Sequence, residues 1–183
     1  MRLDTLTLKS QEALRDAQRL AEEHHHQEIT CEHLLLALLG QEGGIVPSLL
    51  QKIGVDIPHL ARSLSEDLSK RAKVFGDGSV QASISRSTVA AINAAEKEAA
   101  RLGDQFVSTE HLLLGITQQT KTPAAQRLAS SGINSRAIYD ALKSLRGNQR
   151  VASQEPESTY NALDRYAVDL VAQGRKGKLD PVN

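Results

Sequence analysis

Two short stretches decide the fold: Thr30-Cys31-Glu32-His33-Leu34-Leu35-Leu36 and, 78 residues later, Ser108-Thr109-Glu110-His111-Leu112-Leu113-Leu114. The same offset holds without a gap on both sides of the motif and pairs, for example, Ala17 with Ala95. Chance matches would scatter over many offsets, so one shared offset indicates a duplicated unit. The duplication predicts two similar bundles about a pseudo-two-fold axis, an arrangement more typical of a binding module than of an active site.

The composition favours an all-α protein. Hydrophobic residues make up 40% of the 183 residues, whereas aromatic residues make up 3% and there is no Trp. A core of Leu, Ile, Val and Ala favours helices, because Ala and Leu are strong helix formers while aromatic residues favour strands. Lys and Arg number 22, as do Asp and Glu, so the chain lacks the basic excess of a nucleic-acid-binding protein.

The single cysteine and the short apolar runs indicate the cellular compartment of the protein. Cys31 is the only cysteine, so an internal disulfide is excluded and a reducing compartment is expected. No apolar core of a signal peptide follows the first four residues, and the longest apolar run, 34–39, is too short to span a bilayer. We expect a cytoplasmic protein that does not contact membranes.

Capping residues and apolar periodicity predict the first two helices of each copy. Apolar residues recur with a period near 3.6 after Thr7 and after Ser85, which are the expected N-caps. Thr30 and Ser108 are expected to cap the next helix, which should be the most buried one because its Leu triplet is apolar nearly all round. The third residue of this helix is His, so the usual capping box with Glu or Gln is not expected.

Two shorter helices complete each copy. Gly54 and Gly132 fit left-handed C-caps of the third helix, while Asp56 and Asn134 fit N-caps of the fourth. The predicted fold class is therefore all-α, with two pseudo-symmetric four-helix repeats, a linker and a short C-terminal helix.

Composition also predicts how the chain is divided. Turn-forming residues connect the repeats, a polar stretch without apolar periodicity follows the second repeat, and a last helix is expected from Thr159. The predicted segments are a first repeat at 1–70, a connecting loop at 71–83, a second repeat at 84–146, a flexible linker at 147–158 and a final segment at 159–183.

Two candidate chemical sites are weak. A metal site at the histidines of 24–26 with Cys31 and His33 would need converging ligands, but neighbouring helical residues point about 100° apart. A thiol nucleophile at Cys31 is disfavoured because Thr109 stands at its place in the second copy. We expect neither a metal site nor catalytic residues.

The repeated acids and the Ala-rich helix faces are stronger candidates. Glu32 and Glu110 lie in the first turns of equivalent helices. There they stabilise the helix through its dipole. Alternatively, they hold a cationic group of a client between the repeats. Small apolar faces around 13–17 and 91–95 are either core or the walls of a shallow apolar groove for unfolded segments. On the second reading, Ala91, Ile92 and Ala95 are partly exposed and contact the client.

The repeated Glu-His-Leu-Leu-Leu helix resembles the duplicated N-terminal domain of the Clp AAA+ unfoldases. The opening Met1-Arg2-Leu3-Asp4, the turn Gln41-Glu42-Gly43-Gly44, the stretch 102–108 and the tail 158–182 look like the ClpB branch of that family. The resemblance covers the whole chain. It implies capture of unfolded or aggregated polypeptide for a hexameric AAA+ motor that works with the DnaK system.

The resemblance also implies which residues handle substrate, and it shows which family motif this sequence lacks. Thr7, Asp104 and Glu110 match positions associated with substrate handling in ClpB, although a cap, a turn and a first-turn acid explain them structurally. The family's phosphate-binding motif, Gly-x-x-x-x-Gly-Lys-[Ser/Thr], does not occur in this sequence. We therefore expect a monomeric N-terminal domain that is not an enzyme and has no cofactor, with ATP and Mg²⁺ in ATPase modules outside this chain.

An alternative function remains within the same family. The N-terminal domains of ClpA and ClpC dock adaptors, and in ClpC the Glu residues that match Glu32 and Glu110 are implicated in recognising phosphorylated arginine. This sequence keeps both acids, so an adaptor-docking or phosphoarginine-binding domain is the second hypothesis.

Overall fold

The computed structural model describes residues 2–76 and 81–156, which form eight α-helices, a 3₁₀ turn and two strands of two residues each. The all-α fold with four helices in each copy is confirmed, whereas the helix expected from Thr159 lies outside the described residues. The elements of the first copy are η1 Leu3–Thr5, α1 Leu8–Glu23, β1 Glu28–Ile29, α2 Cys31–Leu39, α3 Ile45–Ile53 and α4 Ile57–Ser69; those of the second are β2 Ser83–Ile84, α5 Arg86–Arg101, α6 Thr109–Thr117, α7 Pro123–Ser130 and α8 Ser135–Arg146.

Each helix of the second copy begins 78 residues after its counterpart, because the capping residues repeat at that offset. Thr7 and Ser85 accept hydrogen bonds from the third backbone N–H of α1 and α5, and Asp56 and Asn134 cap α4 and α8 in the same way. These predicted caps are confirmed.

The histidine of the repeated motif completes a capping box, which was not expected. The backbone N–H of Thr30 donates to Nδ1 of His33 over 2.9 Å, and Ser108 does the same with His111 over 2.9 Å. Neutral imidazole has one acceptor nitrogen, so it takes the place of the Glu or Gln carboxyl or amide oxygen.

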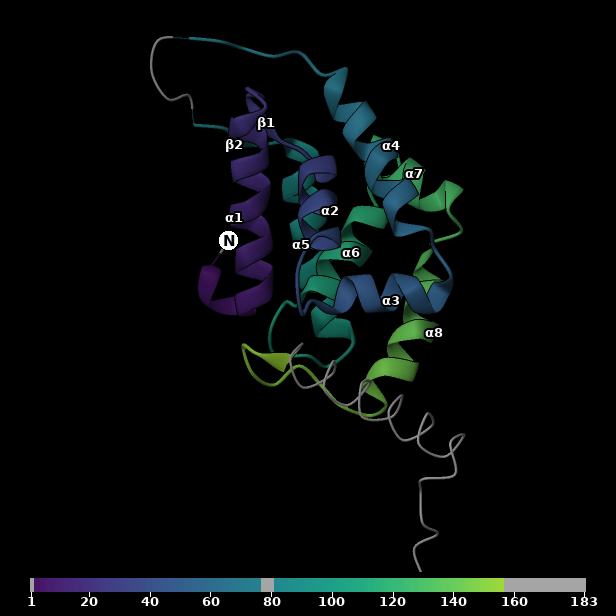
Figure 1. Cartoon of the computed structure of the whole chain (residues 1–183). Coiled ribbons are helices and arrows are strands. Elements are labelled where there is room, and N and C mark those ends of the chain that lie inside the picture. Colours follow the sequence, from purple (N-terminus) through teal and green to yellow (C-terminus); the bar gives the residue numbers. More distant parts are fainter. Residues whose placement is uncertain (1, 77–80, 157–183) are drawn as a thin grey trace, which may run out of the picture.

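The helices of the two copies interlock around one core. α2 and α6 lie side by side in the middle, α1 covers α2, and α5 covers α6 (Figure 1). The last two helices cross between copies, since α3 packs on α8 and α4 packs on α7. The sequence suggested two bundles that meet at an interface, but the buried residues of both copies form a single cluster.

Two short strand contacts join the copies and obey the same offset. Ile29 in β1 pairs in parallel with Ile84 in β2, and Leu6 forms an equivalent parallel bridge with Val107. Each copy therefore contributes the segment before its first helix to the other copy. Strands of two residues are too short to leave an alternating pattern, so the sequence analysis did not predict them.

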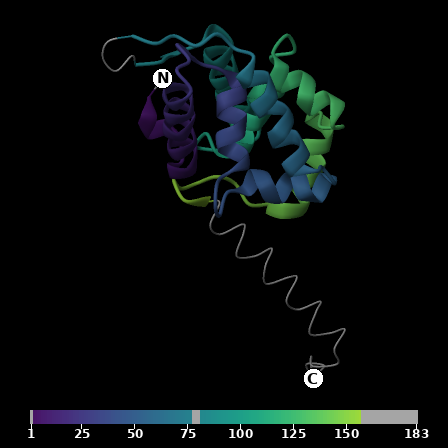
Figure 2. The same ribbon diagram turned by 45° about the horizontal axis from the view of Figure 1, so that its top comes forward.

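Part of the predicted flexible linker lies against the helical body. Figures 1 and 2 show residues 147–156 running from the end of α8 back beneath the lower end of α1. The side chain of Val151 is fully buried, and Gln105 N–H donates to Val151 O over 2.8 Å while Leu8 N–H donates to Gln154 O over 2.9 Å. We call residues 150–154 the strap. The polar composition of the strap concealed its one buried apolar residue.

Candidate functional site

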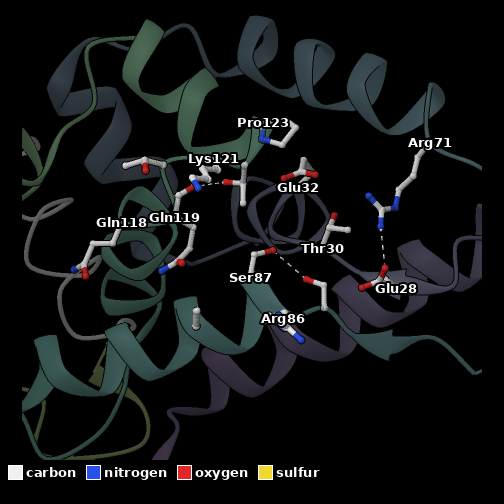
Figure 3. A pocket seen from close by; sticks show the side chains of 14 residues that line it. Glu28, Thr30, Glu32, Arg71, Arg86, Ser87, Gln118, Gln119, Lys121 and Pro123 are labelled. Atoms are coloured by element: carbon white, nitrogen blue, oxygen red, sulfur yellow. Dashed lines mark hydrogen bonds and ion pairs between the residues drawn. The ribbon is translucent and has the colours of Figure 1, made fainter.

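A cleft of about 670 Å³ lies between the two copies (Figure 3). One wall is the β1–α2 junction of the first copy, and the other is the start of α5 with the loop between α6 and α7. Its lining residues are mostly polar: Glu28, Thr30, Glu32, Arg71, Ser85, Arg86, Ser87, Ala90, Gln118, Gln119, Thr120, Lys121, Thr122 and Pro123.

A difference in side-chain length between the copies explains why this cleft stays open. In the first copy, Lys9 Nζ donates to Glu42 O over 2.7 Å and Gln41 Nε2 donates to Lys9 O over 2.8 Å, so the loop after α2 is held against α1. Ser87 stands at the place of Lys9 in the second copy and is too short for the same contact. The Gln119 amide, at the place of Gln41, donates instead to Gly115 O over 3.1 Å.

Three helices begin at the wall of the cleft. The N-cap residues of α2, α5 and α7 (Thr30, Ser85 and Thr122) all line it. Helix N-termini carry partial positive charge, which adds to the full charges of the lining cations. Arg71 is paired with Glu28 at 3.4 Å, and Figure 3 shows this pair near the Glu32 carboxylate.

Glu32 is the one predicted site residue that lines the cleft. Its carboxylate accepts a hydrogen bond from the backbone N–H of Ala124 over 3.2 Å, at the start of α7. Only 5% of the residue is exposed, and this burial raises the pKa of its carboxyl above the usual value although the Ala124 hydrogen bond opposes the shift. A carboxyl so placed accepts hydrogen bonds from a ligand and carries its charge with less solvation than on an open surface.

Glu110 does not share this environment, so the expected equivalence of the two acids is wrong. Its buried carboxylate accepts from Arg146 Nη2 over 2.9 Å and from Arg146 Nε over 3.2 Å. Leu68 occupies the place of Arg146 in the first copy, so Glu32 has no such partner. Glu110 therefore belongs to a buried ion-pair network and is not accessible to a client in this structure.

Asp104 belongs to the same network. Its Oδ2 lies 2.7 Å from His111 Nε2 and 2.9 Å from Arg146 Nη1, and its Oδ1 accepts from Val151 N–H over 2.9 Å. Burial alone would raise the pKa of this carboxyl, but the hydrogen bonds from His111 and Val151 and the charge of Arg146 together lower it to about 2. Asp104 thus anchors the strap.

The order Asp104–His111–Ser108 does not make a catalytic triad. All three residues are buried, and His111 Nδ1 already accepts the Ser108 backbone N–H of the capping box. The Ser108 hydroxyl donates to Glu110. The hydroxyl is therefore not available as a nucleophile, and the network is structural.

Of the two alternatives for the second alanine-rich face, the partly exposed groove wall is wrong and the core is right, since Ala91, Ile92 and Ala95 are all buried. The reason is the close approach of α5 and α6. A Cβ atom placed on Gly115 of α6 would lie 2.0 Å from Ala91 O, so the two backbones are separated by less than one methyl group. The small side chains serve this packing and leave no groove.

Thr7 and Cys31 are also buried. Thr7 caps α1, and its backbone N–H donates to Val107 O over 3.0 Å, next to the strap. Burial raises the pKa of the Cys31 thiol to about 11, so it remains protonated at neutral pH. Within residues 2–76 and 81–156, no group of three His, Cys, Asp or Glu side chains is close enough to hold a metal ion.

The sequence analysis missed the cations of the cleft. Arg71, Arg86 and Lys121 are far apart in the sequence, so no local pattern groups them. One sequence signal could have located the cleft: Ser87 in the second copy replaces Lys9 of the first, and the cleft stays open beside the shorter residue. No helix in the described part of the chain is long and apolar enough to cross a membrane.

Residues 5–131 match the model of the Clp repeat (R) N-terminal domain, so the chain belongs to this family. Within it, the chain is 40% identical over 184 residues to "Chaperone protein ClpB" of Bacillus cereus and 40% identical over 176 residues to the protein of the same name from Mycobacterium tuberculosis. These alignments cover 100% and 96% of the chain. The chain spans about a fifth of the length of these relatives (21% and 20%).

Solved structures have the same fold. The N-terminal domain of Hsp104 from Candida albicans superposes with a TM-score of 0.71 at 19% identity, covering 84% of this chain and 99% of that one. The N-terminal domain of the ClpV1 ATPase from E. coli has a TM-score of 0.69 at 24% identity, covering 84% and 92%. A ClpV N-domain solved in complex with a VipB peptide has a TM-score of 0.62 at 19% identity, covering 82% and 91%.

Proposed function

We propose that this chain is the substrate-binding domain of a ClpB-type disaggregase in the cytoplasm. In this proposal it captures unfolded or aggregated polypeptide and delivers it to a hexameric AAA+ motor that works with the DnaK system. ATP and Mg²⁺ act in modules outside this chain. The identity of 40% with ClpB chaperones over the whole chain carries the proposal, and the cleft beside Glu32 supplies a place for binding.

Binding should be weak, because a captured client must be released forward to the motor. We expect a dissociation constant in the micromolar range or weaker, about −8 kcal/mol or less favourable. Fluorescence anisotropy with labelled, reduced and carboxymethylated α-lactalbumin, which cannot fold, measures it. Native α-lactalbumin is the control and should not bind. Nanomolar affinity, or no binding at the highest soluble concentration, contradicts client capture.

A matched pair of variants tests whether the cleft takes part. Ala90→Arg places a long cation inside the cleft, whereas Ala129→Arg places the same side chain on the exposed face of α7. Only the first substitution should weaken binding of unfolded α-lactalbumin, by about tenfold. Equal affinity of the two variants for unfolded α-lactalbumin would show that the cleft does not bind the client.

The adaptor-docking and phosphoarginine hypothesis is less well supported. Its phosphoarginine part relied on two equivalent acids, but Glu110 is paired with Arg146, and of the two acids Glu32 alone lines the cleft. The relatives at 40% identity are also ClpB chaperones. A pull-down from lysate that returns one stoichiometric partner, rather than many unfolded proteins, would favour adaptor docking instead.

A further inference from the structure

We propose that the outer edge of β2 and the first turn of α5, residues 83–89, form a docking strip for an extended segment of polypeptide. The segment would pair with the backbone of Ile84 and Arg86 and place an aliphatic side chain against Ile84 and Val89. This inference rests on the proposed function and specifies where and in which conformation the client is held.

The strip presents an exposed aliphatic pair. Ile84 and Val89 are 42% and 43% exposed, which is unusual in a chain whose other aliphatic residues mostly lie in the core. Because Ser85 caps α5, Ile84 and Val89 occupy the N′ and N4 positions, which is the spacing of a hydrophobic staple. The staple spacing alone does not explain why the side chains of Ile84 and Val89 are exposed to water.

The backbone of the strip faces outward. Ser83 N–H donates to Gln27 O over 3.0 Å and Ser85 N–H donates to Ile29 O over 3.1 Å, so both residues use the edge of β2 that faces β1. Successive residues of a strand direct their polar groups to opposite edges, so Ile84 directs its N–H and C=O away from β1. An outward edge of this kind accepts an added strand.

The equivalent edge of the other copy is already occupied. Leu6 and Leu8 stand 78 residues before Ile84 and Arg86, and Leu6 bridges to Val107 as Ile84 does to Ile29. There the strap supplies the partner: Leu8 N–H donates to Gln154 O over 2.9 Å, and Gln154 Nε2 lies 3.4 Å from Leu6 O. Leu6 is fully buried. The strap therefore contacts the edge of that copy through one backbone and one side-chain hydrogen bond, both made by Gln154 at a bend of the chain.

The connector of the first copy takes a different path from the strap. After α4 it runs over the upper end of α1 (Figures 1 and 2), and Val74 N–H donates to His25 O over 2.8 Å. Within the described residues, no hydrogen bond joins this connector to Ile84 or Arg86. The vacant edge is continuous with the cleft, because Ser85, Arg86 and Ser87 belong to both. A client on the strip can therefore continue toward Glu32.

The occupant should be an extended strand of alternating residues. Alternation places one side chain against Ile84 and Val89 and the next toward solvent, so aliphatic and uncharged polar residues in turn fit best. A capped peptide Val-Gln-Val-Gln-Val-Gln meets this requirement. The same peptide methylated at its backbone nitrogens keeps the side chains and the carbonyl acceptors but loses the N–H groups that would donate to the edge, and its methyl groups hinder close approach.

Nuclear magnetic resonance of the ¹⁵N-labelled chain tests the strip. The capped peptide should shift the amide signals of residues 83–89, and the methylated peptide should bind at least about tenfold more weakly. Ile84→Asp should weaken binding of the peptide and of unfolded α-lactalbumin by about tenfold. The matched control is Leu8→Asp on the occupied edge, where Leu8 is 44% exposed, and it should leave both affinities within about twofold.

The outcomes separate this inference from the proposed function. If unfolded α-lactalbumin binds equally well to the chain and to Ile84→Asp, or if the shifts lie away from 83–89, the docking strip is wrong and client capture stands. If neither the peptide nor unfolded α-lactalbumin binds to the unsubstituted chain, both proposals fail. Circular dichroism should show an unchanged fold for Ile84→Asp, since Ile84 lies outside the core cluster.

Discussion

At the scale of residues, three exchanges between the copies give the repeated Glu residues different environments. Lys9 corresponds to Ser87, His26 to Asp104 and Leu68 to Arg146. In the second copy Arg146 pairs with both Asp104 and Glu110, whereas the first copy keeps a histidine pair, with His26 Nδ1 at 2.9 Å from His33 Nε2. Glu32 remains without a buried cation for this reason.

Replacing Arg146 by Ala should destabilise the domain by about 3–5 kcal/mol, because two buried carboxylates lose their cation. Urea unfolding followed by circular dichroism measures the change. Arg136→Ala is the control on the same helix, since its pair with Asp140 is exposed and should contribute about 0–1 kcal/mol. Equal losses for the two variants would contradict a structural role for the network.

The histidine pair predicts a loss of stability in mild acid. Burial, together with the charges of His26 and Arg71, lowers the pKa of His33 from 6.5 to about 4. The unfolded chain therefore binds a proton first as the pH falls, so this contribution is complete above pH 6.5 and is lost toward pH 4, by roughly 3 kcal/mol.

His33→Gln tests the pH dependence, because Gln can complete the capping box but does not titrate. Urea unfolding between pH 4 and 7 should show a smaller decline for this variant than for the unsubstituted chain. If the two chains decline in parallel, His33 is not the group responsible.

At the scale of elements, α5 packs closely on α6 at Gly115. Ala91 and Ala95 face a helix that has Gly115 at the contact, whereas the equivalent residue of α2 is Ala37. The second copy is therefore packed more closely than the first at this position. The alanine stripe that suggested a groove reflects this close approach.

Gly115→Ala should destabilise the domain by about 1–3 kcal/mol or more, because the new methyl group would overlap the Ala91 carbonyl and the helices must separate. Thermal unfolding measures it. Without the clash, Ala would stabilise this helix position by about 1 kcal/mol. The reverse substitution at the equivalent site, Ala37→Gly, serves as control and should cost about 1 kcal/mol from helix propensity. A stabilised Gly115→Ala variant would refute the close approach.

At the scale of the whole molecule, the strap connects residues that the resemblance had grouped. Asp104 accepts the Val151 N–H, Arg146 joins Asp104 to Glu110, and Thr7 lies next to the Leu8–Gln154 hydrogen bond. We expect substitutions at Asp104 and Glu110 to displace the strap, and to affect client binding only through that displacement.

Val151→Asp should release the strap, because it buries a second carboxylate beside Asp104. Hydrogen exchange of the Leu8 and Gln105 amides, which donate to strap carbonyls, should become about tenfold faster or more. Ala152→Asp adds the same charge at an exposed neighbour and should leave both rates unchanged. Slow exchange in Val151→Asp would show that the strap is not held by this residue.

The sequence predicted the helical part of the fold well and the site poorly. Hydroxyl and Asx caps, left-handed glycines and a 3.6-residue period are local signals, so the helices of the described residues and their offset could be read from single stretches. The cleft, the strap and the network around Arg146 depend on residues that are 30 to 150 positions apart, such as Gln154 with Leu6. No local pattern records such contacts.

The sequence by itself determined the duplication, the all-α class, the family resemblance and the helix caps, because each is encoded within a few neighbouring residues or in one constant offset. Only the tertiary structure decided that the copies interlock, that the alanine stripe is core, and that Glu110 is buried while Glu32 lines a cleft. The physical reason is that burial and charge pairing arise when distant segments meet. Equivalent residues of a repeat acquire different environments when the segments that cover them differ.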